Sequence, residues 1–284
     1  MGNPEPPAMH FDRRQLLQTG GLSVALGALV AACGDDSVAE EAPGRVGYAP
    51  PATPLPTVET NDIVYLRTVT SIEVTLVDTF GQIAELGALD GADLAMLERL
   101  IEDHREAATA TAELTVEAGG EPYECANSWY VNRVVTPMLE LIEGDESADI
   151  PPSDDPTRDS LVVIHGMESM TGSMYQQMVE LVSVPELRAE MMVFGAAAAR
   201  HAAAVAIAAT GAPEGYVNPE LVGGEVVPDE SGLVPLYAIP TTFGALTPIP
   251  VTIGAPNDAG IRTTINLETP AANSFVYEGE TCEA

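Results

Sequence analysis

Lysine is absent from this 284-residue chain, and its 11 basic residues are all arginine. Against them stand 43 aspartate and glutamate residues, which gives a formal net charge of −32 at pH 7. A surface this acidic repels phosphate backbones and anionic lipid headgroups, because like charges repel. We therefore expect an acidic, soluble surface and exclude nucleic acid as a partner.

The N-terminal region lacks a hydrophobic run long enough to span a membrane. Its apolar stretch, Thr19–Ala32, holds roughly 14 residues, fewer than the about 20 that a spanning helix needs. The stretch follows Arg13-Arg14 and leads directly into Cys33 through small residues. In this order the features predict a twin-arginine signal segment over residues 1–33, in preference to a signal anchor or a buried helix.

A lipid on Cys33 is the predicted membrane anchor. Diacylation there would supply two acyl chains, which is enough for stable attachment. The predicted location is the cell envelope, on the extracytoplasmic face of a bacterial membrane. Residues 34–59 are rich in proline and acidic residues, and this composition predicts an extended linker between the membrane and the following domain.

Cysteine is scarce, with three residues in the whole chain. If Cys33 carries lipid, Cys125 and Cys282 remain, and in an oxidising compartment two cysteines most simply form one disulfide. A metal site built on the two sulfurs is the alternative, but the sequence places no further ligands near them. The predicted disulfide joins the middle of the chain to its C-terminal end.

Sequence motifs for nucleotide binding and for serine hydrolysis are also missing. No glycine-rich phosphate loop or Walker pattern occurs, and Ser160 and Ser173 have no Ser-His-acid context. These absences leave the few histidines and the acidic residues as the candidates for chemistry.

Helical periodicity dominates residues 60–211. Apolar stripes predict four long helices, and a fifth, short one lies in the long connection between the second and third. Their expected ranges are Asn61–Gly87, Gly91–Gly119, Trp129–Ile142, Asp155–Ser183 and Pro185–Thr210. Two hairpins joined by one long crossover predict an all-α core with the connectivity of a four-helix bundle.

The chain changes character after Gly211, where glycine and proline become frequent and β-branched runs appear. Residues 212–284 are predicted to form a small β-rich C-terminal extension, and whether it is a separate domain stays open. The runs that predict strands are Val234–Ile239, Pro250–Ile253, Arg262–Leu267 and Ser274–Tyr277.

Five ionisable residues fall on the apolar stripes of the four long helices: Glu73, His104, His165, Glu168 and His201. A buried carboxylate without a partner is costly, so these side chains need a cation, a hydrogen bond or a changed protonation state. Two carboxylates and three imidazoles are a plausible ligand set for a divalent metal. The alternative is internal pairing of histidine with glutamate and no metal.

Several segments resemble the exported bacterial ferritin-like family. The resemblance covers about residues 60 to 280, a length typical of a single domain. They are Tyr65–Arg67, Ser71–Glu73, Glu102–Arg105, Gly166–Ser169 with Tyr175, Ala199–Ala202, and Pro240–Gly244. The resemblance implies a ferritin-like bundle, whose di-iron pattern has a lone Glu on two helices and Glu-x-x-His on the other two.

Carried onto this chain, Glu73 and Glu168 match the lone glutamates, and His104 and His201 match the motif histidines. Ile101 and Ala198 stand where the two motif glutamates would be. The resemblance therefore does not imply di-iron oxidase activity, because two of four bridging carboxylates are lost. With His165 as a further ligand, it favours one zinc, iron or manganese ion instead of an iron pair.

The primary hypothesis is therefore an exported, lipid-anchored ferritin-like protein with a structural or interaction role and without di-iron oxidase activity. The alternative hypothesis is a metal-binding protein with a mononuclear or atypical di-metal site in its core. A third is a binding module that holds a protein partner through the crossover loop and the C-terminal strands.

Overall fold

The computed structural model describes residues 60–211, 221–222, 225–226, 249–268 and 274–282. The predicted signal segment, with Arg13, Arg14 and Cys33, lies outside the described residues. The predicted linker 34–59 and the predicted strand Val234–Ile239 also fall outside them, so these stay predictions.

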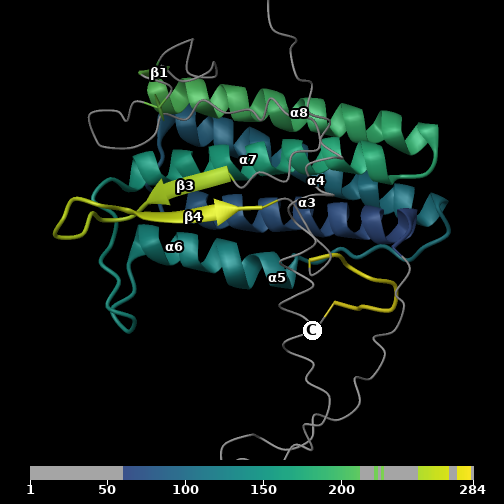
Figure 1. Cartoon of the computed structure of the whole chain (residues 1–284), viewed down its shortest axis with the longest axis horizontal. Coiled ribbons are helices and arrows are strands. Elements are labelled where there is room, and N and C mark those ends of the chain that lie inside the picture. The colour runs from purple at the N-terminus through teal and green to yellow at the C-terminus, as the bar shows by residue number, and fades with distance from the viewer. Residues whose placement is uncertain (1–59, 212–220, 223–224, 227–248, 269–273, 283–284) are drawn as a thin grey trace, which may run out of the picture. The chain divides into compact units, whose positions relative to one another are not determined.

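Four long helices account for most of the described chain (Figure 1). They are α3 (Asp62–Glu85), α4 (Gly91–Glu117), α7 (Pro156–Leu181) and α8 (Pro185–Thr210). Each lies within two residues of its predicted bounds. The side chain of Asn61 accepts a hydrogen bond from the Val64 amide at 3.1 Å and caps the start of α3. Gly211, with φ 65°, ends α8 in the left-handed conformation.

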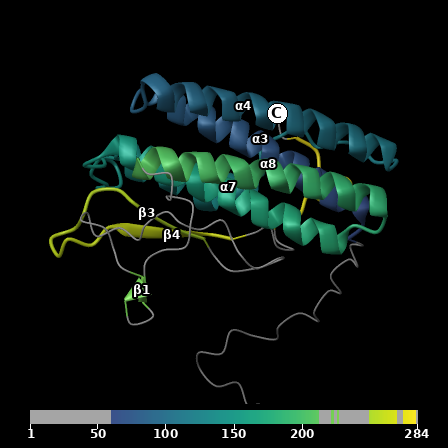
Figure 2. The same cartoon turned by 90° about the horizontal axis from the view of Figure 1, so that it is seen from above.

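The long helices pack as two antiparallel hairpins, α3 with α4 and α7 with α8. Figure 2 shows the two hairpins as two layers. Across the layers α3 packs against α7, whereas α4 and α8 make the fewest contacts of these four pairs. The core between the layers is built from fully buried side chains such as Leu76, Phe80, Met167 and Met174.

The crossover contains helix where the sequence predicted it, but not as one regular helix. The short α5 (Ser128–Tyr130) continues into a π-helical turn, η2 (Val131–Val135), and then into α6 (Thr136–Glu143). Pro137 lacks an amide hydrogen and its ring would clash with the preceding turn of a regular α-helix. A π-turn immediately before it relieves this conflict.

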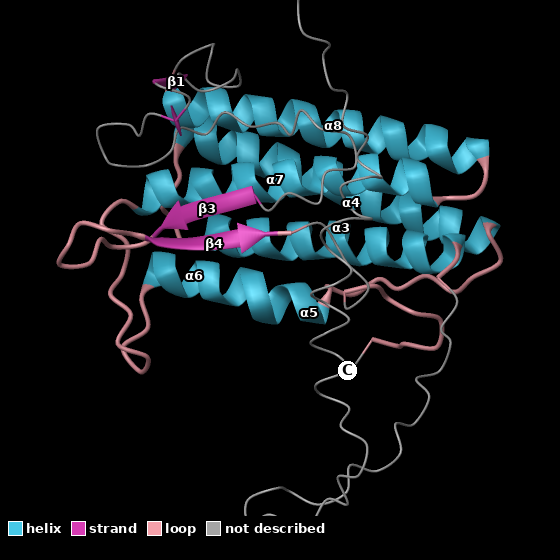
Figure 3. Cartoon of the chain, viewed as in Figure 1, coloured by secondary structure: helices cyan, strands magenta, loops and turns pink. Residues whose placement is uncertain are grey.

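Two C-terminal strands, β3 (Ile249–Ile253) and β4 (Thr263–Leu267), pair antiparallel with Val251 opposite Ile265. They confirm two predicted strands and pack against α7 (Figure 3). A very short hairpin, β1 (Leu221–Val222) with β2 (Glu225–Val226), was not predicted. The described protein is thus mostly helical with a small antiparallel sheet near its C-terminus.

The predicted strand Ser274–Tyr277 is wrong, because this segment is irregular and pairs with no strand among the described residues. Its backbone instead bonds to side chains of the helical core. The Val276 amide donates to Thr68 Oγ1 at 2.9 Å, and the Ser274 carbonyl accepts from the Asn127 side-chain amide at 2.9 Å. Side chains therefore supply the hydrogen bonds that a neighbouring strand would otherwise supply.

A disulfide joins Cys125 to Cys282, with their Cα atoms 5.9 Å apart, which confirms the predicted pair. The buried guanidinium of Arg67 reinforces this connection. It donates to the carbonyl of Glu121 and, at 2.5 Å, to that of Glu280. The crossover and the C-terminal segment are thus held together on α3 by one covalent bond and one buried cation.

Among the described helices, α8 alone is long and apolar enough to cross a membrane by length and composition. Core helices of soluble proteins pass the same test, and a third of the apolar window of α8 is buried inside the protein.

Candidate functional site

Four of the five predicted site residues meet in the interior, one from each long helix. Glu73 comes from α3, His104 from α4, Glu168 from α7 and His201 from α8. All four lie on the apolar stripe of their helix, and this stripe faces the core.

His104 lies between two buried carboxylates. Its Nδ1 is 2.6 Å from Glu73 Oε2, and its Nε2 is 2.8 Å from Glu168 Oε1. Ionised carboxylates only accept hydrogen bonds, so this arrangement requires both ring nitrogens to be protonated. Burial by itself would lower the pKa of His104, but the charges of Glu168 and Glu73 and their hydrogen bonds raise it to about 10. In the metal-free protein His104 is an imidazolium.

Tyr175 binds the carboxylate oxygen of Glu73 that does not face His104. Its hydroxyl donates to Glu73 Oε1, so both oxygens of Glu73 have partners. Burial, followed by the charge of Glu73, raises the pKa of Tyr175 well above its usual value, and the phenol keeps its proton. The ring of Tyr175 stacks on Phe194 with centroids 5.4 Å apart, which fixes its direction.

His201 lies between the buried carboxylate of Glu168 and the partly exposed carboxylate of Asp103. Its Nδ1 lies 3.3 Å from Glu168 Oε1, and its Nε2 lies 3.3 Å from Asp103 Oδ2. Asp103 in turn pairs with Arg99 one helical turn earlier on α4. Asp103 was missed by the sequence interpretation, since only the approach of α8 to α4 makes it a partner of His201. The Arg99–Asp103 spacing of four residues was the one available signal.

Glu168 is the centre of the group and is fully buried. Burial would raise its pKa, but His104 and His201 outweigh burial and lower it, so the carboxylate stays ionised. Its Oε1 faces both imidazoles, whereas Oε2 has no hydrogen-bond partner among the described residues. A buried carboxylate oxygen without a partner is a position that a cation would satisfy.

His165 is buried but lies outside the group of converging ligand atoms. Three residues along α7 correspond to a turn of about 300°, so His165 is displaced by about 60° from Glu168 around the helix. Burial lowers the pKa of His165 to about 4, against the charge of Glu168, and the ring is neutral. Its predicted part as a fifth ligand is not supported by this arrangement.

Three of the four converging residues form a metal-compatible group. His104, Glu168 and His201 each offer one ligand atom, and these atoms all lie within 4.8 Å of one another. Bonds of about 2.1 Å in tetrahedral geometry would place ligand atoms about 3.4 Å apart. The 3.3 Å between His201 and Glu168 meets this value, and the 2.8 Å between His104 and Glu168 needs a small widening.

A cavity of about 450 Å³ opens between α4 and α8 and reaches this group. Glu73, His104 and His201 line its inner part. Small residues form much of its wall: Ala107, Ala110, Ala197 and Ala198. Ala198 is the position where the ferritin-like pattern would have a glutamate, so an apolar wall replaces that carboxylate.

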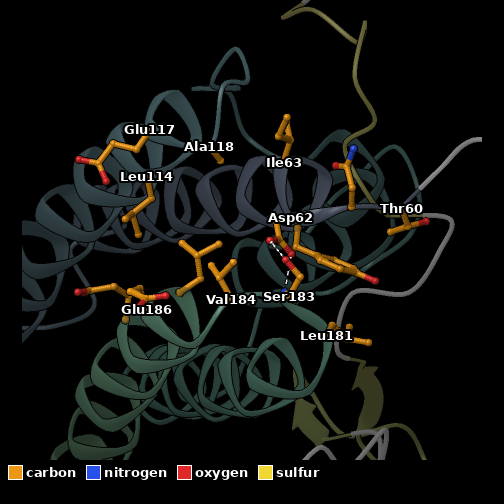
Figure 4. Close-up of a pocket in the computed structure, with 14 residues that line it drawn as sticks. Thr60, Asp62, Ile63, Leu114, Glu117, Ala118, Leu181, Ser183, Val184 and Glu186 are labelled. Carbon is orange, nitrogen blue, oxygen red and sulfur yellow. Dashed lines mark hydrogen bonds between the residues drawn. The ribbon is translucent and has the colours of Figure 1, made fainter.

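A larger cavity, of about 720 Å³, lies where α3 begins and α7 meets α8 (Figure 4). Asp62 is tied there to Ser183, whose amide and hydroxyl both donate to its carboxylate. The other charged residues in its wall are Glu117, Glu186 and Glu190. Among the described residues, no histidine, cysteine or basic residue lines this cavity, so the smaller cavity is the better candidate for chemistry.

Comparison with protein-family models, with curated proteins and with solved structures finds no match to this chain. The proposals below therefore rest on the chain's own residues.

Proposed function

We propose that this protein binds one divalent metal ion through His104, Glu168 and His201. The observation that carries the proposal is that both imidazoles approach the same carboxylate oxygen. One nitrogen of each ring approaches Glu168 Oε1, at 2.8 and 3.3 Å, while the second oxygen of that buried carboxylate has no partner among the described residues. Two imidazoles and one carboxylate suit zinc, iron(II) and manganese.

The outer carboxylates strengthen the proposal. Glu73 accepts from His104 Nδ1, and Asp103 lies at 3.3 Å from His201 Nε2. Metal-binding histidines usually donate their other ring N–H to a carboxylate or carbonyl, which orients the ring and makes the free nitrogen more basic. Glu73 is this carboxylate for His104, and Asp103 is the corresponding one for His201. Tyr175 binds Glu73, and Arg99 pairs with Asp103.

Metal binding has a defined protonation cost. His104 must release the proton on Nε2 before that nitrogen can act as a ligand. The proton remains on Nδ1, where Glu73 accepts it. The ion would supply positive charge that replaces the proton between His104 and Glu168 and also neutralises the free oxygen of Glu168. When bound, such an ion polarises ligands in its open position as a Lewis acid.

The second candidate is a metal-free protein with a structural or interaction role. Its specific support is the fully hydrogen-bonded ring of His104, whose two nitrogens both have carboxylate partners. In that case the imidazolium itself compensates the two buried carboxylates. Neither candidate predicts di-iron oxidase activity, since Ile101 and Ala198 replace both motif glutamates.

We also propose that the four long helices form a ferritin-like bundle and that the protein is exported and lipid-anchored. Two hairpins joined by one long crossover support the first part. The twin arginines and Cys33 support the second, which places the protein on the extracytoplasmic face of a bacterial membrane. The membrane is then a partner through the lipid anchor alone.

Elemental analysis of the exported protein tests the metal proposal. We expect about one equivalent of zinc, iron or manganese per chain, lost in H104A and H201A. The matched control is H165Q, which changes a buried histidine outside the ligand group and should retain the metal. Stoichiometric metal that persists in H104A and H201A would refute this ligand set and place the ion elsewhere. No metal in the wild-type protein after exposure to each ion would refute the proposal in favour of the metal-free candidate.

A further inference from the structure

We infer that the cavity between α4 and α8 binds a small oxyanion, held by the metal ion on one side and by Arg200 on the other. This inference rests on the proposed metal site and names the class of ligand that reaches it. Phosphate and carboxylate groups share the required chemistry, which is an exposed oxygen carrying negative charge.

The proposed ion is reached between α4 and α8, which pack together less closely than the other neighbouring long helices. α4 and α8 make fewer contacts than the other neighbouring pairs, and alanines line both sides of this interface. A cavity of about 450 Å³ lies in the lower part of the range for small-molecule sites. The same cavity is lined by His104 and His201, so a ligand inside it meets the two imidazoles directly.

Three protein ligands leave a coordination position for a non-protein ligand. The ring of Phe80 covers His104 on the core side, with its centroid 5.5 Å from that of the imidazole. Glu168 is fully buried, so no ligand reaches the ion past it. The cavity is therefore the side from which a small molecule can complete the coordination.

Arg200 supplies the second recognition element. It lines the cavity next to His201, its side chain is exposed, and no ion pair or hydrogen bond of its side chain is found among the described residues. Arg99 on the opposite wall differs, because Asp103 neutralises it. A guanidinium binds phosphate and carboxylate groups through paired hydrogen bonds.

Three acidic residues line the cavity, Glu73, Asp103 and Glu106, and the first two already have cationic partners in His104 and Arg99. Glu106 is exposed on α4 and has no cationic partner among the described residues, so its charge reduces the affinity for an anion. The inference therefore predicts that removal of Arg200 lowers the affinity for the anion and that removal of Glu106 raises it.

The test uses the full exported protein loaded with cobalt(II), whose visible absorption reports its coordination. Inorganic phosphate and acetate are added separately, and each is expected to change the spectrum in a saturable way if its oxygen enters the open position. In R200Q the apparent affinity should fall about tenfold, and in E106Q it should rise a few-fold. R133Q, which removes an arginine that lies over Trp129 in the crossover, is the matched control and should have no effect.

The outcomes separate the two proposals. Failure to retain cobalt(II) removes the metal site and this inference with it. Retained cobalt with an unchanged spectrum at high phosphate and high acetate leaves the metal site intact and overturns the anion inference. An equal affinity in R200Q and wild-type protein overturns the role of Arg200. A response to only one of the two anions identifies which oxyanion class the cavity takes.

Discussion

Nε2 of His104 lies 2.8 Å from Oε1 of Glu168, and both residues are buried. In the metal-free protein a proton occupies this gap, and in the proposed metal-bound protein an ion occupies it. For this pair of residues the two states need similar side-chain positions, because the two atoms have to separate by only about 0.6 Å to reach tetrahedral spacing. The proposed ion would therefore require little movement of His104 relative to Glu168.

Replacing Glu73 with glutamine is expected to weaken metal binding without unfolding the protein. The change removes the carboxylate that accepts from His104 Nδ1 and leaves the three ligands in place. Loss of such an outer carboxylate typically lowers metal affinity about 10- to 100-fold. Competition with a chelator measures the effect. The control is E102Q, because Glu102 is about half exposed on α4 and pairs only with Arg105; equal affinities in the two variants would contradict the prediction.

Helical periodicity located most of this site in advance. The positions of Glu73, His104, Glu168 and His201 follow from the 3.6-residue repeat, since a residue on an apolar stripe faces the core. Asp103 could not be found in this way, because it lies beside the stripe and its partner sits on another helix. His165 was grouped with Glu168 because residues three apart lie on one face of a helix, but its ring is not among the converging ligand atoms.

The C-terminal extension was predicted less well than the helices. The run that became β3 has a partner, β4, and both were predicted. Ser274–Tyr277 has similar composition but lies against α3 and the crossover, where Thr68 and Asn127 bind its backbone. Strand propensity depends on having a neighbouring strand, and the sequence of one segment does not report whether a neighbour exists.

The metal-free protein is expected to lose stability as the pH rises from 6.5 towards 10. The pKa of His104 is raised from 6.5 to about 10 in the folded protein, so its contribution is complete below pH 6.5 and disappears as the pH passes through the folded value. Between pH 6.5 and 9 we expect a fall in Tm of about 5 °C in the presence of a chelator. Thermal unfolding followed by circular dichroism measures it.

The variant H104Q is the control for this pH dependence and should show a flatter Tm profile over the same range. At low pH the direction reverses. The pKa of Glu168 is lowered in the folded protein, so its contribution is present above the pKa of an unfolded glutamate and is lost as the pH falls through the folded value. A Tm that rises between pH 6.5 and 9 in the metal-free wild-type protein would show that His104 is not an imidazolium.

Removing the disulfide is expected to release the C-terminal segment while the helices remain folded. The bond joins residues 157 positions apart, and disulfides typically stabilise a folded protein by about 2–4 kcal/mol. In the double variant C125S/C282S, proteolysis should cut within residues 274–282 before it cuts the long helices. The helical circular dichroism signal at 25 °C should stay unchanged. Equal protease resistance with and without the bond would show that Arg67 and the side-chain hydrogen bonds hold the segment by themselves.

Gly166 is expected to be the position on α7 that permits the sheet to dock. A Cβ atom at this residue would lie 2.5 Å from Cγ2 of Val251, which is much closer than carbon atoms approach in folded proteins. Because Val251 is branched at Cβ and buried, it has little freedom to move. G166A should therefore lower the free energy of unfolding by about 1–3 kcal/mol, measured by urea denaturation.

Two further variants separate the steric effect from the helix propensity of alanine. G81A introduces the same residue into α3 where no atom lies within 4 Å of the added carbon, so it should stabilise the protein by about 0.5–1 kcal/mol. V251A removes the methyl group that G166A would meet, so the double variant G166A/V251A should be less destabilised than the sum of the single variants. Additive effects in this cycle would mean that the backbone of β3 shifts to accept the new side chain and that Gly166 is not required for docking.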